Sequence, residues 1–538
     1  MITEDQSDVV ALLSSPTTHG GAPVERIDTH TSIVFLAGER AWKLKRAVRY
    51  DYLDYSTADR RRAMCEAEVR INRRTAPALY RGVVAVTRQA DGSLSIGGSG
   101  TPVDWLVEMT RFDQSGLFDR LAEAGVLPLK LMSPLAHVIA RFHRAADGAT
   151  NQGGWEAMRR VIDGNAAGFA REGAGILGPL RCTRLTDHAR FVLDHGDVLL
   201  DRRRDDGMFR HCHGDLHLRN ILLLGDQPTL FDAIEFNDNI SSIDVLYDLA
   251  FLLMDLWRLN LPHHANFVLN DYLAQTGDLD GLSLMPLFLS CRAAVMAKTT
   301  AASARLQIDA DQRLQLQARA NDYLTMAEDM LEPPPPRLVA VGGISGTGKS
   351  TLAMALAPVI GSAPGAVVIR SDVIRKKLCG VEPLTRLGPE GYTDDVSRRV
   401  YATIMEQADK IVCGGYTAIA DAVFAESADR DAVEHVARAA GVPFVGLWLD
   451  APVPVLLSRV AGRADVSDAG IEVMWRQLGY QLDSPRWQRL NASGTRQQVC
   501  DSAAMIVGGQ KKTVATGAAP QEGDMKVRLQ PRIQSSTK

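Results

Sequence analysis

Two separate groups of residues in this chain have the types and the spacing needed to handle phosphate. In the first, His213-Gly-Asp-Leu-His-Leu-Arg-Asn220, a carboxylate and an amide stand close together in one loop. An aspartate in such a loop can accept the proton of an attacking hydroxyl, and an asparagine oxygen can hold a metal ion that bridges phosphates. Asp215 is therefore predicted to be the general base and Asn220 a metal ligand.

The second group, Gly343-Ile-Ser-Gly-Thr-Gly-Lys-Ser350, is a complete P-loop sequence. An apolar strand, 338–341, precedes it and a helical run follows, which is the context that such a loop requires. Glycines let successive backbone N–H groups surround phosphate oxygens, and the lysine adds a mobile charge. The hydroxyl of Ser350 is also a predicted magnesium ligand. The predicted nucleotide-binding residues of this loop are Gly343, Ser345, Gly346, Thr347, Gly348, Lys349, Ser350 and Thr351.

A second carboxylate for the first group is expected at Asp232. It follows a strand, 229–231, that a short turn connects to the strand 221–224. Magnesium prefers oxygen ligands and keeps some of its water, so Asn220, Asp232 and a triphosphate would suffice to bind it. Glu235 is either an additional acid or a polar support.

Residues near the N-terminus could complete this nucleotide site. The segments 32–36 and 41–46 are typical of two strands in a hairpin, from which Lys43 would project. A lysine there could pair with the α- and β-phosphates of ATP and be held by a glutamate from a helix. Glu68 is preferred to Glu66 for that role, although the sequence does not separate the two.

The first group of residues resembles the aminoglycoside phosphotransferase family. The resemblance rests on 213–220, Leu230–Glu235 and Asp244–Asp248, and it covers roughly residues 25–330. It implies a two-lobed protein-kinase-like fold in which Asp215 is the catalytic base and Asn220 and Asp232 hold magnesium. The segment expected to form the nucleotide loop, residues 29–33, lacks the triple-glycine pattern, as is frequent in that family.

Four further polar residues near this loop are interpreted as structural. His213 and His217 are expected to orient the loop through hydrogen bonds and not to transfer protons. Asp244 and Asp248 are expected to cap or brace the helix that begins near residue 246. A run of mixed charges, 201–207, is interpreted as a solvated turn.

After the P-loop, strands and helices alternate, so chemistry is expected at the carboxyl edge of a parallel sheet. One strand leads to Asp372, which could take the proton of the acceptor or cap a helix, with Arg375 nearby. Another ends at Asp421, the predicted acid of the metal site. Farther along, Arg459 and Arg463 could close over the transferring phosphate, and Arg463 is predicted to be catalytic. This part, about residues 337–508, resembles small P-loop kinases such as gluconate kinases, polynucleotide kinase domains and zeta-toxin-like enzymes.

The four prolines 333–336 mark the clearest boundary in the chain, because they exclude helix and sheet and favour an extended spacer. The predicted organisation is a kinase-like domain over 1–332, a proline linker over 333–336, a P-loop domain over 337–509 and a disordered tail over 510–538. The predicted fold class is an N-terminal α+β two-lobed protein-kinase-like fold followed by a C-terminal α/β P-loop NTPase with a parallel sheet.

Composition limits the partners and the compartment. A formal net charge of −4 gives no global attraction to nucleic acid or to an anionic membrane. The seven cysteines show no paired spacing and are typical of reduced cytosolic thiols. There is no signal-peptide pattern and no uninterrupted apolar run long enough to span a membrane. A cytoplasmic protein without a membrane partner is expected.

As a whole, the sequence is similar to bacterial fusions of an aminoglycoside phosphotransferase with an ATP-binding domain. The leading hypothesis is a pair of centres that use ATP and Mg²⁺ to phosphorylate small-molecule hydroxyls. Two alternatives stay open. One domain could sense or hydrolyse ATP to regulate the other, or the P-loop half could phosphorylate polynucleotide ends, as the basic run Arg375–Lys377 suggests. The acceptors and the oligomeric state are not identified by the sequence.

Overall fold

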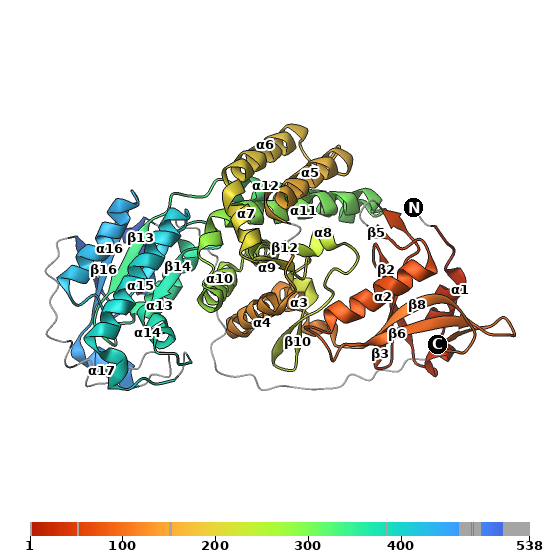
Figure 1. The fold of residues 1–538 in the computed structure, drawn as a ribbon, viewed down its shortest axis with the longest axis horizontal. Coiled ribbons are helices and arrows are strands. Elements are labelled where there is room, and N and C mark those ends of the chain that lie inside the picture. The colour runs from red at the N-terminus through yellow and green to blue at the C-terminus, as the bar shows by residue number, and fades with distance from the viewer. Residues whose placement is uncertain are drawn as a thin grey trace, which may run out of the picture.

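The computed structural model describes residues 3–508 except 51–52, 150–152, 383–384, 462–474, 476 and 478–485. Three bodies follow one another along its long axis (Figure 1). The small lobe of the kinase-like domain lies at one end, its helical large lobe in the middle and the P-loop domain at the other end.

The small lobe is a six-stranded antiparallel sheet with order β1-β2-β3-β8-β6-β7 and a helix, α2, packed on it. The predicted hairpin is present, with β2 (Ser32–Ala37) and β3 (Arg40–Lys45) joined by a two-residue turn in which Gly38 has a φ of 56°. Because strand side chains alternate between faces, Lys43 and Lys45 project from the same side of β3. The remaining elements are α1 (Ser7–Ser14), β1 (Val24–Asp28), β4 (Arg49–Tyr50), β5 (Leu53–Asp54), α2 (Ala58–Asn72), β6 (Tyr80–Arg88), β7 (Leu94–Ile96) and β8 (Thr101–Thr110).

The large lobe is built around α9 (Val245–Arg258), an apolar helix whose residues 245–256 are all buried. The hairpin of β10 (Ile221–Leu224) and β11 (Gln227–Leu230) follows the loop that contains Asp215. The other elements are α3 (Phe118–Glu123), α4 (Met132–Ala145), α5 (Gly154–Arg171), α6 (Pro179–His195), α7 (Asp197–Asp205), β9 (Phe209–His211), α8 (Asp238–Ser241), β12 (Ser242–Asp244), α10 (Pro262–Thr276), α11 (Met285–Leu306) and α12 (Ala310–Met330).

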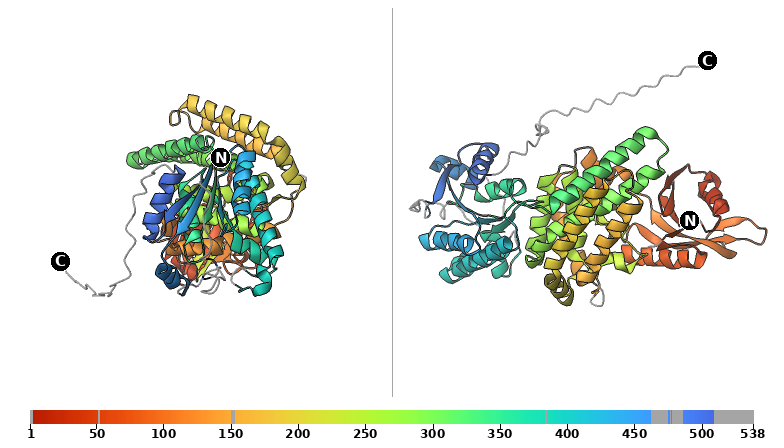
Figure 2. Two further views of the ribbon diagram at one scale, coloured as in Figure 1. Left: turned by 90° about the vertical axis from the view of Figure 1, so that its left-hand side faces the viewer. Right: turned by 90° about the horizontal axis from the view of Figure 1, so that it is seen from above.

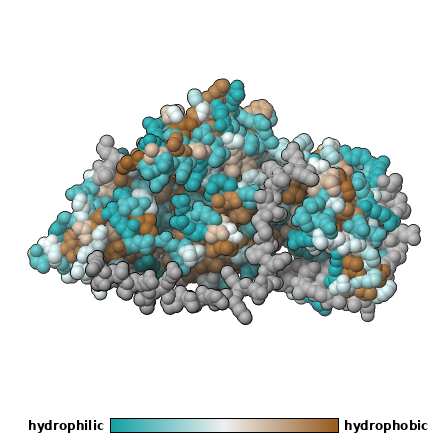
Figure 3. Space-filling view, turned by 180° about the vertical axis from the view of Figure 1, so that it is seen from behind, coloured by the Kyte–Doolittle hydropathy of each residue, from teal (hydrophilic) through white to brown (hydrophobic). Residues whose placement is uncertain are grey.

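The longest helices of this lobe, α11 and α12, lie side by side (Figure 2). The stretch Asp280–Leu306 is apolar and long enough to cross a membrane, yet 72% of its most apolar window is buried inside the protein. Burial of this kind is typical of a core helix in a globular domain. On the face seen in Figure 3, hydrophilic residues dominate the described surface and apolar ones form separate small patches.

The P-loop domain is a five-stranded parallel sheet with order β14-β15-β13-β16-β17 and helices on its faces. Parallel strands place their carboxyl ends at one edge, where the P-loop also lies. Its elements are β13 (Leu338–Gly342), α13 (Lys349–Leu356), β14 (Val367–Arg370), α14 (Ser371–Leu378), α15 (Asp394–Cys413), β15 (Ala418–Asp421), α16 (Ser427–Ala439), β16 (Phe444–Asp450), α17 (Val453–Ala461), β17 (Trp487–Asn491) and α19 (Arg496–Val507).

The two domains pack against each other, although the four prolines stand between α12 and β13. A single hydrophobic cluster contains Leu282 and Met285 of the large lobe together with Ile369 and Ile411 of the P-loop domain. Helix α10 lies next to β14, an edge strand of the parallel sheet (Figure 1). The proline segment therefore joins bodies that share an apolar interface.

The charged run that was interpreted as a solvated turn is mostly the helix α7, so that prediction is wrong. Arg203 is buried, and it donates hydrogen bonds to Asp244 at 2.7 Å and to Asp278 at 2.6 Å. Asp244 also caps α9 as predicted, because its side chain accepts a hydrogen bond from the Leu246 amide. A guanidinium between two carboxylates is stable in the interior, which is why this charge is not at the surface.

Candidate active sites

The loop 213–220 brings its acid and its amide into direct contact. Asn220 Nδ2 donates to the Oδ2 and to the main-chain oxygen of Asp215, both at 3.0 Å. His217 Nε2 lies 3.2 Å from Asp215 Oδ2. Burial alone would raise the pKa of Asp215, but the charge and hydrogen bond of His217 outweigh it, and the pKa is lowered. Asp215 is therefore an ionised carboxylate, oriented by two neighbours.

Asp232 lies at the same end of the β10–β11 hairpin as Asn220. The amide of Phe231 donates to the Asn220 carbonyl at 3.1 Å, which aligns the two predicted metal ligands across the hairpin. Asp232 has a φ of 61°, a left-handed conformation that costs a non-glycine residue about 1 kcal/mol. Its Oδ1 lies 2.5 Å from Lys43 Nζ, and its side chain stays 41% exposed. A strained, accessible carboxylate beside a lysine is suited to binding a ligand.

Lys43 connects this carboxylate to helix α2. Its Nζ donates to Glu68 Oε1 at 2.8 Å, whereas Glu66 is exposed and pairs with Arg62. The structure thus separates the two glutamates that the sequence left open, in favour of Glu68. Burial alone would lower the pKa of Lys43, but the charges of Asp232 and Glu68 raise it well above its ordinary value. The side chain of Lys43 therefore stays protonated.

The sequence analysis assigned no role to Lys45, a second lysine of the same strand. Lys45 is fully buried and binds Glu68 Oε2 at 2.6 Å, and it also contacts Glu235. The hydroxyl of Tyr55 donates to Glu235 at 2.7 Å. Of the two roles considered for Glu235, the contacts favour polar support, because its carboxylate is enclosed by partners. The i, i+2 spacing of the two lysines on a strand was the signal that could have revealed Lys45.

Apolar side chains from both lobes meet beside Lys43. One buried cluster contains Ala41, Met109 and Leu222, with Ile27 and Val34 packed against it. Such a surface suits a planar base. A separate hollow of about 780 Å³ is lined by neither Lys43 nor the acids of the loop, so it is distinct from the group of candidate residues. It is lined by Glu25, Leu36, Gly38, Glu39, Arg40, Arg81 and residues 110–114.

The P-loop has the backbone geometry of an anion cradle. Gly343, Gly346 and Gly348 have φ values of 134°, 90° and 89°, which residues other than glycine rarely adopt. These turns direct backbone N–H groups into the loop. The amide of Ser345 donates to the side-chain oxygen of Gln477 at 2.8 Å, so an electron-rich oxygen already sits where a phosphate oxygen would bind.

The metal-site residues predicted for the second centre lie together. Asp421 ends β15, and the side chain of Ser350, at the start of α13, hydrogen-bonds to it. Burial raises the pKa of Asp421, although the charges of Arg370 and Lys349 act in the opposite direction. The pairing of Ser350 with a buried carboxylate beside a lysine offers oxygen ligands to a hard cation.

A pocket of about 530 Å³ extends from the P-loop across the carboxyl edge of the sheet. Asp372 lines it from the first turn of α14, and Arg375 lines it while donating to the Gly391 carbonyl at 2.7 Å and lying over the Tyr392 ring. Arg459 contacts the Thr347 and Ala492 carbonyls. Arg463 lies outside the described residues. Other lining residues are Lys349, Ser350, Thr351, Asp394, Ser397, Arg398, Tyr401, Asp421, Glu426, Asp429 and Gln477.

Two family models match the chain. Residues 55–283 match the phosphotransferase enzyme family, and residues 338–486 match an AAA domain. Residues 55–283 are thus similar to that phosphotransferase family, and residues 338–486 are similar to that AAA domain. The two matches support ATP-binding, kinase-type domains, and they confirm the predicted fold class and the family resemblance. The phosphotransferase-family match includes Asp215, Asn220 and Asp232, and the AAA match includes the P-loop.

The similar proteins align with most of the chain or with a part of it. An uncharacterized protein of Mycobacterium tuberculosis is 29% identical over 89% of this chain and 94% of its own length. The adenylyl-sulfate kinase of Myxococcus xanthus is 33% identical over 22% of this chain and 59% of its own. A choline/ethanolamine kinase family structure from Mesorhizobium loti, 13% identical, covers 61% of this chain and 95% of its own at a TM-score of 0.38.

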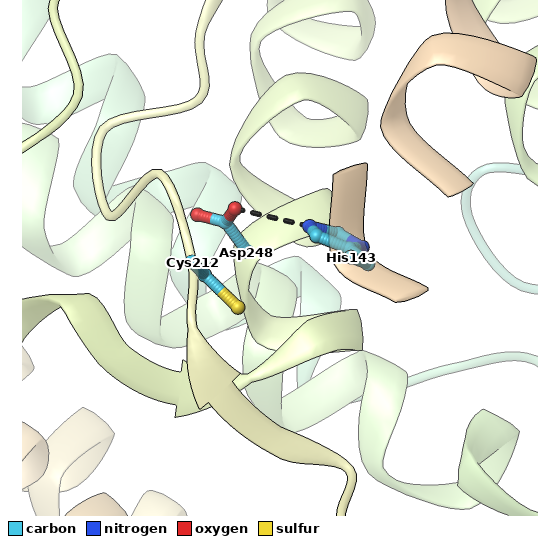
Figure 4. A group of neighbouring side chains, drawn as sticks. All are labelled: His143, Cys212 and Asp248. Atoms are coloured by element: carbon cyan, nitrogen blue, oxygen red, sulfur yellow. Dashed lines mark hydrogen bonds and ion pairs between the residues drawn. The ribbon is translucent and has the colours of Figure 1, made fainter. Parts of the chain in front are cut away.

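Helix α9 holds the loop 213–220 in place, a role that the sequence analysis did not predict. Asp248 does not act as a helix cap, because its two oxygens accept the amides of His213 at 3.0 Å and Gly214 at 2.9 Å. His143 of α4 contacts the same carboxylate at 3.1 Å (Figure 4). Two turns along the helix, Asp255 accepts the amide of Leu218 at 3.1 Å. Both ends of the loop are thus held by one helix.

Cys212 also lies beside Asp248 and His143, and the three potential ligand atoms are within 4.8 Å of one another (Figure 4). Both nitrogens of His143 already have partners, because Nδ1 lies 2.9 Å from the Tyr272 hydroxyl. Burial raises the pKa of the Cys212 thiol well above its ordinary value, which keeps it protonated. We interpret the group as a brace for the loop and not as a metal centre.

Replacing Asp248 with asparagine should weaken this brace. The amide removes the charge that strengthens two backbone hydrogen bonds, so we expect about 2 kcal/mol less stability and about a tenfold to hundredfold loss of turnover at the first site. Turnover would be measured in a Lys349→Ala background. Asp244→Asn is the matched control, since it alters the buried carboxylate that caps α9 and binds Arg203 instead of the loop. Equal losses of turnover in both variants would contradict the bracing role.

Asp429 of α16, in the wall of the second pocket, gives a pH-dependent prediction. Burial, followed by the charge of Glu426, raises its pKa to about 6. Between about pH 4 and pH 6 the folded chain binds more protons than the unfolded chain, so stability falls as the pH rises through this window. Asp429→Asn should therefore stabilise the protein by about 1–2 kcal/mol at pH 7 and little at pH 4. Urea unfolding at both pH values would test it, with the exposed Asp431→Asn as control.

Proposed function

We propose that this protein is a kinase with two active centres, each of which uses ATP and Mg²⁺ to phosphorylate a hydroxyl of a small molecule. The observation that supports this proposal most directly is that each domain brings together its own residues for binding phosphate and metal and for orienting a hydroxyl. Lys43, Asp215, Asn220 and Asp232 converge at one place. The P-loop, Asp372 and Asp421 converge at another, on a different fold.

At the first centre, Lys43 would bind the α- and β-phosphates, and Glu68 holds its ammonium in place. Asn220 and Asp232 would hold Mg²⁺, which neutralises charge on the phosphates. Asp215 would accept a hydrogen bond from the acceptor hydroxyl and direct it toward the γ-phosphate. With its lowered pKa, Asp215 is a weak base, so it would take the proton late, after most of the bond to the leaving group has broken.

At the second centre, the glycine-rich loop and the N-terminus of α13 would surround the phosphates, with Lys349 adding charge. Ser350 and Asp421 would hold the metal, and Asp372 would orient the acceptor hydroxyl. The lining of the pocket combines acids that can bind hydroxyls with arginines that can bind an anionic group. We include Arg463 as a residue that would close over the transferring phosphate.

A small acceptor is favoured over a polynucleotide at this centre. The nucleic-acid alternative rested on the basic run Arg375–Lys377, but Lys376 is buried and Arg375 binds the Gly391 carbonyl. A single exposed lysine from this run does not form a track for a phosphate backbone. A pocket of about 530 Å³ matches a small molecule in size.

We also propose the domain limits 1–332 and 337–509, with the linker 333–336 between them, in a cytoplasmic protein. The tail predicted over 510–538 lies outside the described residues. Helix α12 ends at Met330 and β13 begins at Leu338, which supports a domain boundary between them.

Screening metabolite extracts with [γ-³²P]ATP would test the function. Wild type, Asp215→Asn and Lys349→Ala would be compared as full-length chains. We expect at least two labelled products, of which each variant loses a different one. If no product is labelled, or if one variant abolishes all labelling while the other changes nothing, two active centres are excluded. The second result would instead favour a regulatory role for one domain.

A further inference from the structure

Helix α10 belongs to the kinase-like domain in sequence, but it completes the sheet of the P-loop domain. Strand β14 is one of the two edge strands of this sheet, and β15 is the strand that pairs with it. Its other edge faces α10 (Figure 1). An unpaired strand edge has backbone groups that need hydrogen-bond partners when they are buried.

Asn270 supplies those partners. Its Oδ1 accepts the amide of Val368 at 2.7 Å, and its Nδ2 donates to the Ala366 carbonyl at 3.2 Å. One side-chain amide thus makes the pair of hydrogen bonds that a neighbouring strand would make. Asn266, one turn earlier, donates to the same Ala366 carbonyl at 3.0 Å. Both asparagines are buried, so the bonds are not shared with water.

The strand that Asn270 holds leads directly into the second centre. β14 has only four residues and ends at Arg370, which lies in register with Asp421. Arg370 Nε is 3.8 Å from Asp421 Oδ2, and this buried nitrogen has no hydrogen-bond partner within the described part of the chain. Asp372 follows two residues later in α14. A shift of β14 would therefore move Arg370 and Asp372 relative to the P-loop.

The opposite face of α10 is fixed by the first domain. Tyr272 contacts His143, whose other nitrogen contacts Asp248, the residue that holds the first catalytic loop. Helix α10 also packs on α4 and α9. It is therefore a rigid support that stands between the two centres and not a flexible appendage.

We propose that Asn270 is a positioning residue for the second centre, supplied in cis by the kinase-like domain. By holding β14, it sets the places of Arg370 and Asp372 for phosphate transfer. The P-loop connects β13, which two strands separate from α10, to the N-terminus of α13, whereas α10 packs on the turn 357–359 beyond the other end of that helix. Binding of the nucleotide should therefore be largely independent of Asn270. The inference rests on the proposed function of the P-loop domain.

The test compares full-length wild type with Asn270→Leu, which keeps the volume of the side chain but removes both hydrogen bonds to β14. The rate measured is the ATP turnover that Lys349→Ala abolishes. We expect Asn270→Leu to lower this rate about tenfold while the ATP dissociation constant of the second site stays within about twofold. Asn165→Leu is the matched control, because Asn165 is also buried and donates to the Cys291 carbonyl, far from β14.

Hydrogen–deuterium exchange of residues 366–372 gives a second measurement, and Asn270→Ala replaces the leucine variant if that chain does not fold. Faster exchange there, together with the lower turnover, is the expected result. The inference is overturned if turnover stays within twofold of wild type, if Asn165→Leu lowers it equally, or if exchange is unchanged. If wild type itself shows no turnover dependent on Lys349, the proposed function fails, and exchange alone then decides whether Asn270 holds β14.

Discussion

Lys349→Ala should lower ATP turnover at the second centre by about a hundredfold to a thousandfold, because Lys349 is the one cationic residue in the sequence of the loop 343–350. The backbone N–H groups of the loop remain, so we expect ATP binding to weaken less than turnover. Lys349 also lies near Asp421 and lowers its pKa, so its loss leaves a buried carboxylate with less compensation. A metal ion would itself compensate that carboxylate, so the loss of Lys349 should lower turnover without weakening the binding of the metal at Asp421.

The experiment needs the first centre to be silent, which the Asp215→Asn background provides. Turnover would be followed at saturating ATP over a range of Mg²⁺ concentrations. Lys410→Ala is the control, since Lys410 is exposed on α15 and pairs with Glu406. Retention of most of the turnover by Lys349→Ala would mean that the P-loop binds nucleotide without taking part in phosphate transfer.

The parts of both centres that depend on local spacing could be predicted from the sequence. A P-loop fixes its own backbone through glycines at set positions, and Asp215 and Asn220 share one short loop, so their contact follows from their separation. The hairpin that presents Lys43 was likewise predictable, because strand alternation and a glycine turn are local features. These elements position the chemistry in each domain.

The residues that were missed depend on partners distant in the sequence. Arg203 was interpreted as solvated, because nothing in its neighbourhood indicates that Asp244 and Asp278 will enclose it. Asp248 was expected to serve its own helix, yet it binds amides of a loop 35 residues earlier. Asn270 lies in an ordinary helix, and only the packing of the domains shows that it completes a sheet. Such roles follow from tertiary structure and leave no local pattern.

Asp215→Asn should abolish phosphate transfer at the first centre, with a loss of about a hundredfold to ten-thousandfold in turnover and little change in ATP affinity. The amide keeps the size of the side chain but cannot accept a proton. The substitution should also affect His217, because the carboxylate raises the pKa of that imidazole against the effect of burial. In the variant the pKa of His217 should fall.

Two measurements separate this catalytic role from a merely structural one. Turnover in a Lys349→Ala background reports the chemistry, and NMR titration of His217 reports the loss of its charged partner. The exposed Asp226→Asn, in the turn between β10 and β11, is the control and should change neither. If Asp215→Asn lowered the pKa of His217 but left turnover intact, the carboxylate would serve only to hold the imidazole.

The loop itself should be preserved in the variant. The side chain of Asn220 donates to the main-chain oxygen of residue 215 as well as to its side chain, and the main-chain hydrogen bond does not depend on the carboxylate. A loss of turnover with an unchanged ATP affinity would then assign proton acceptance to Asp215 itself.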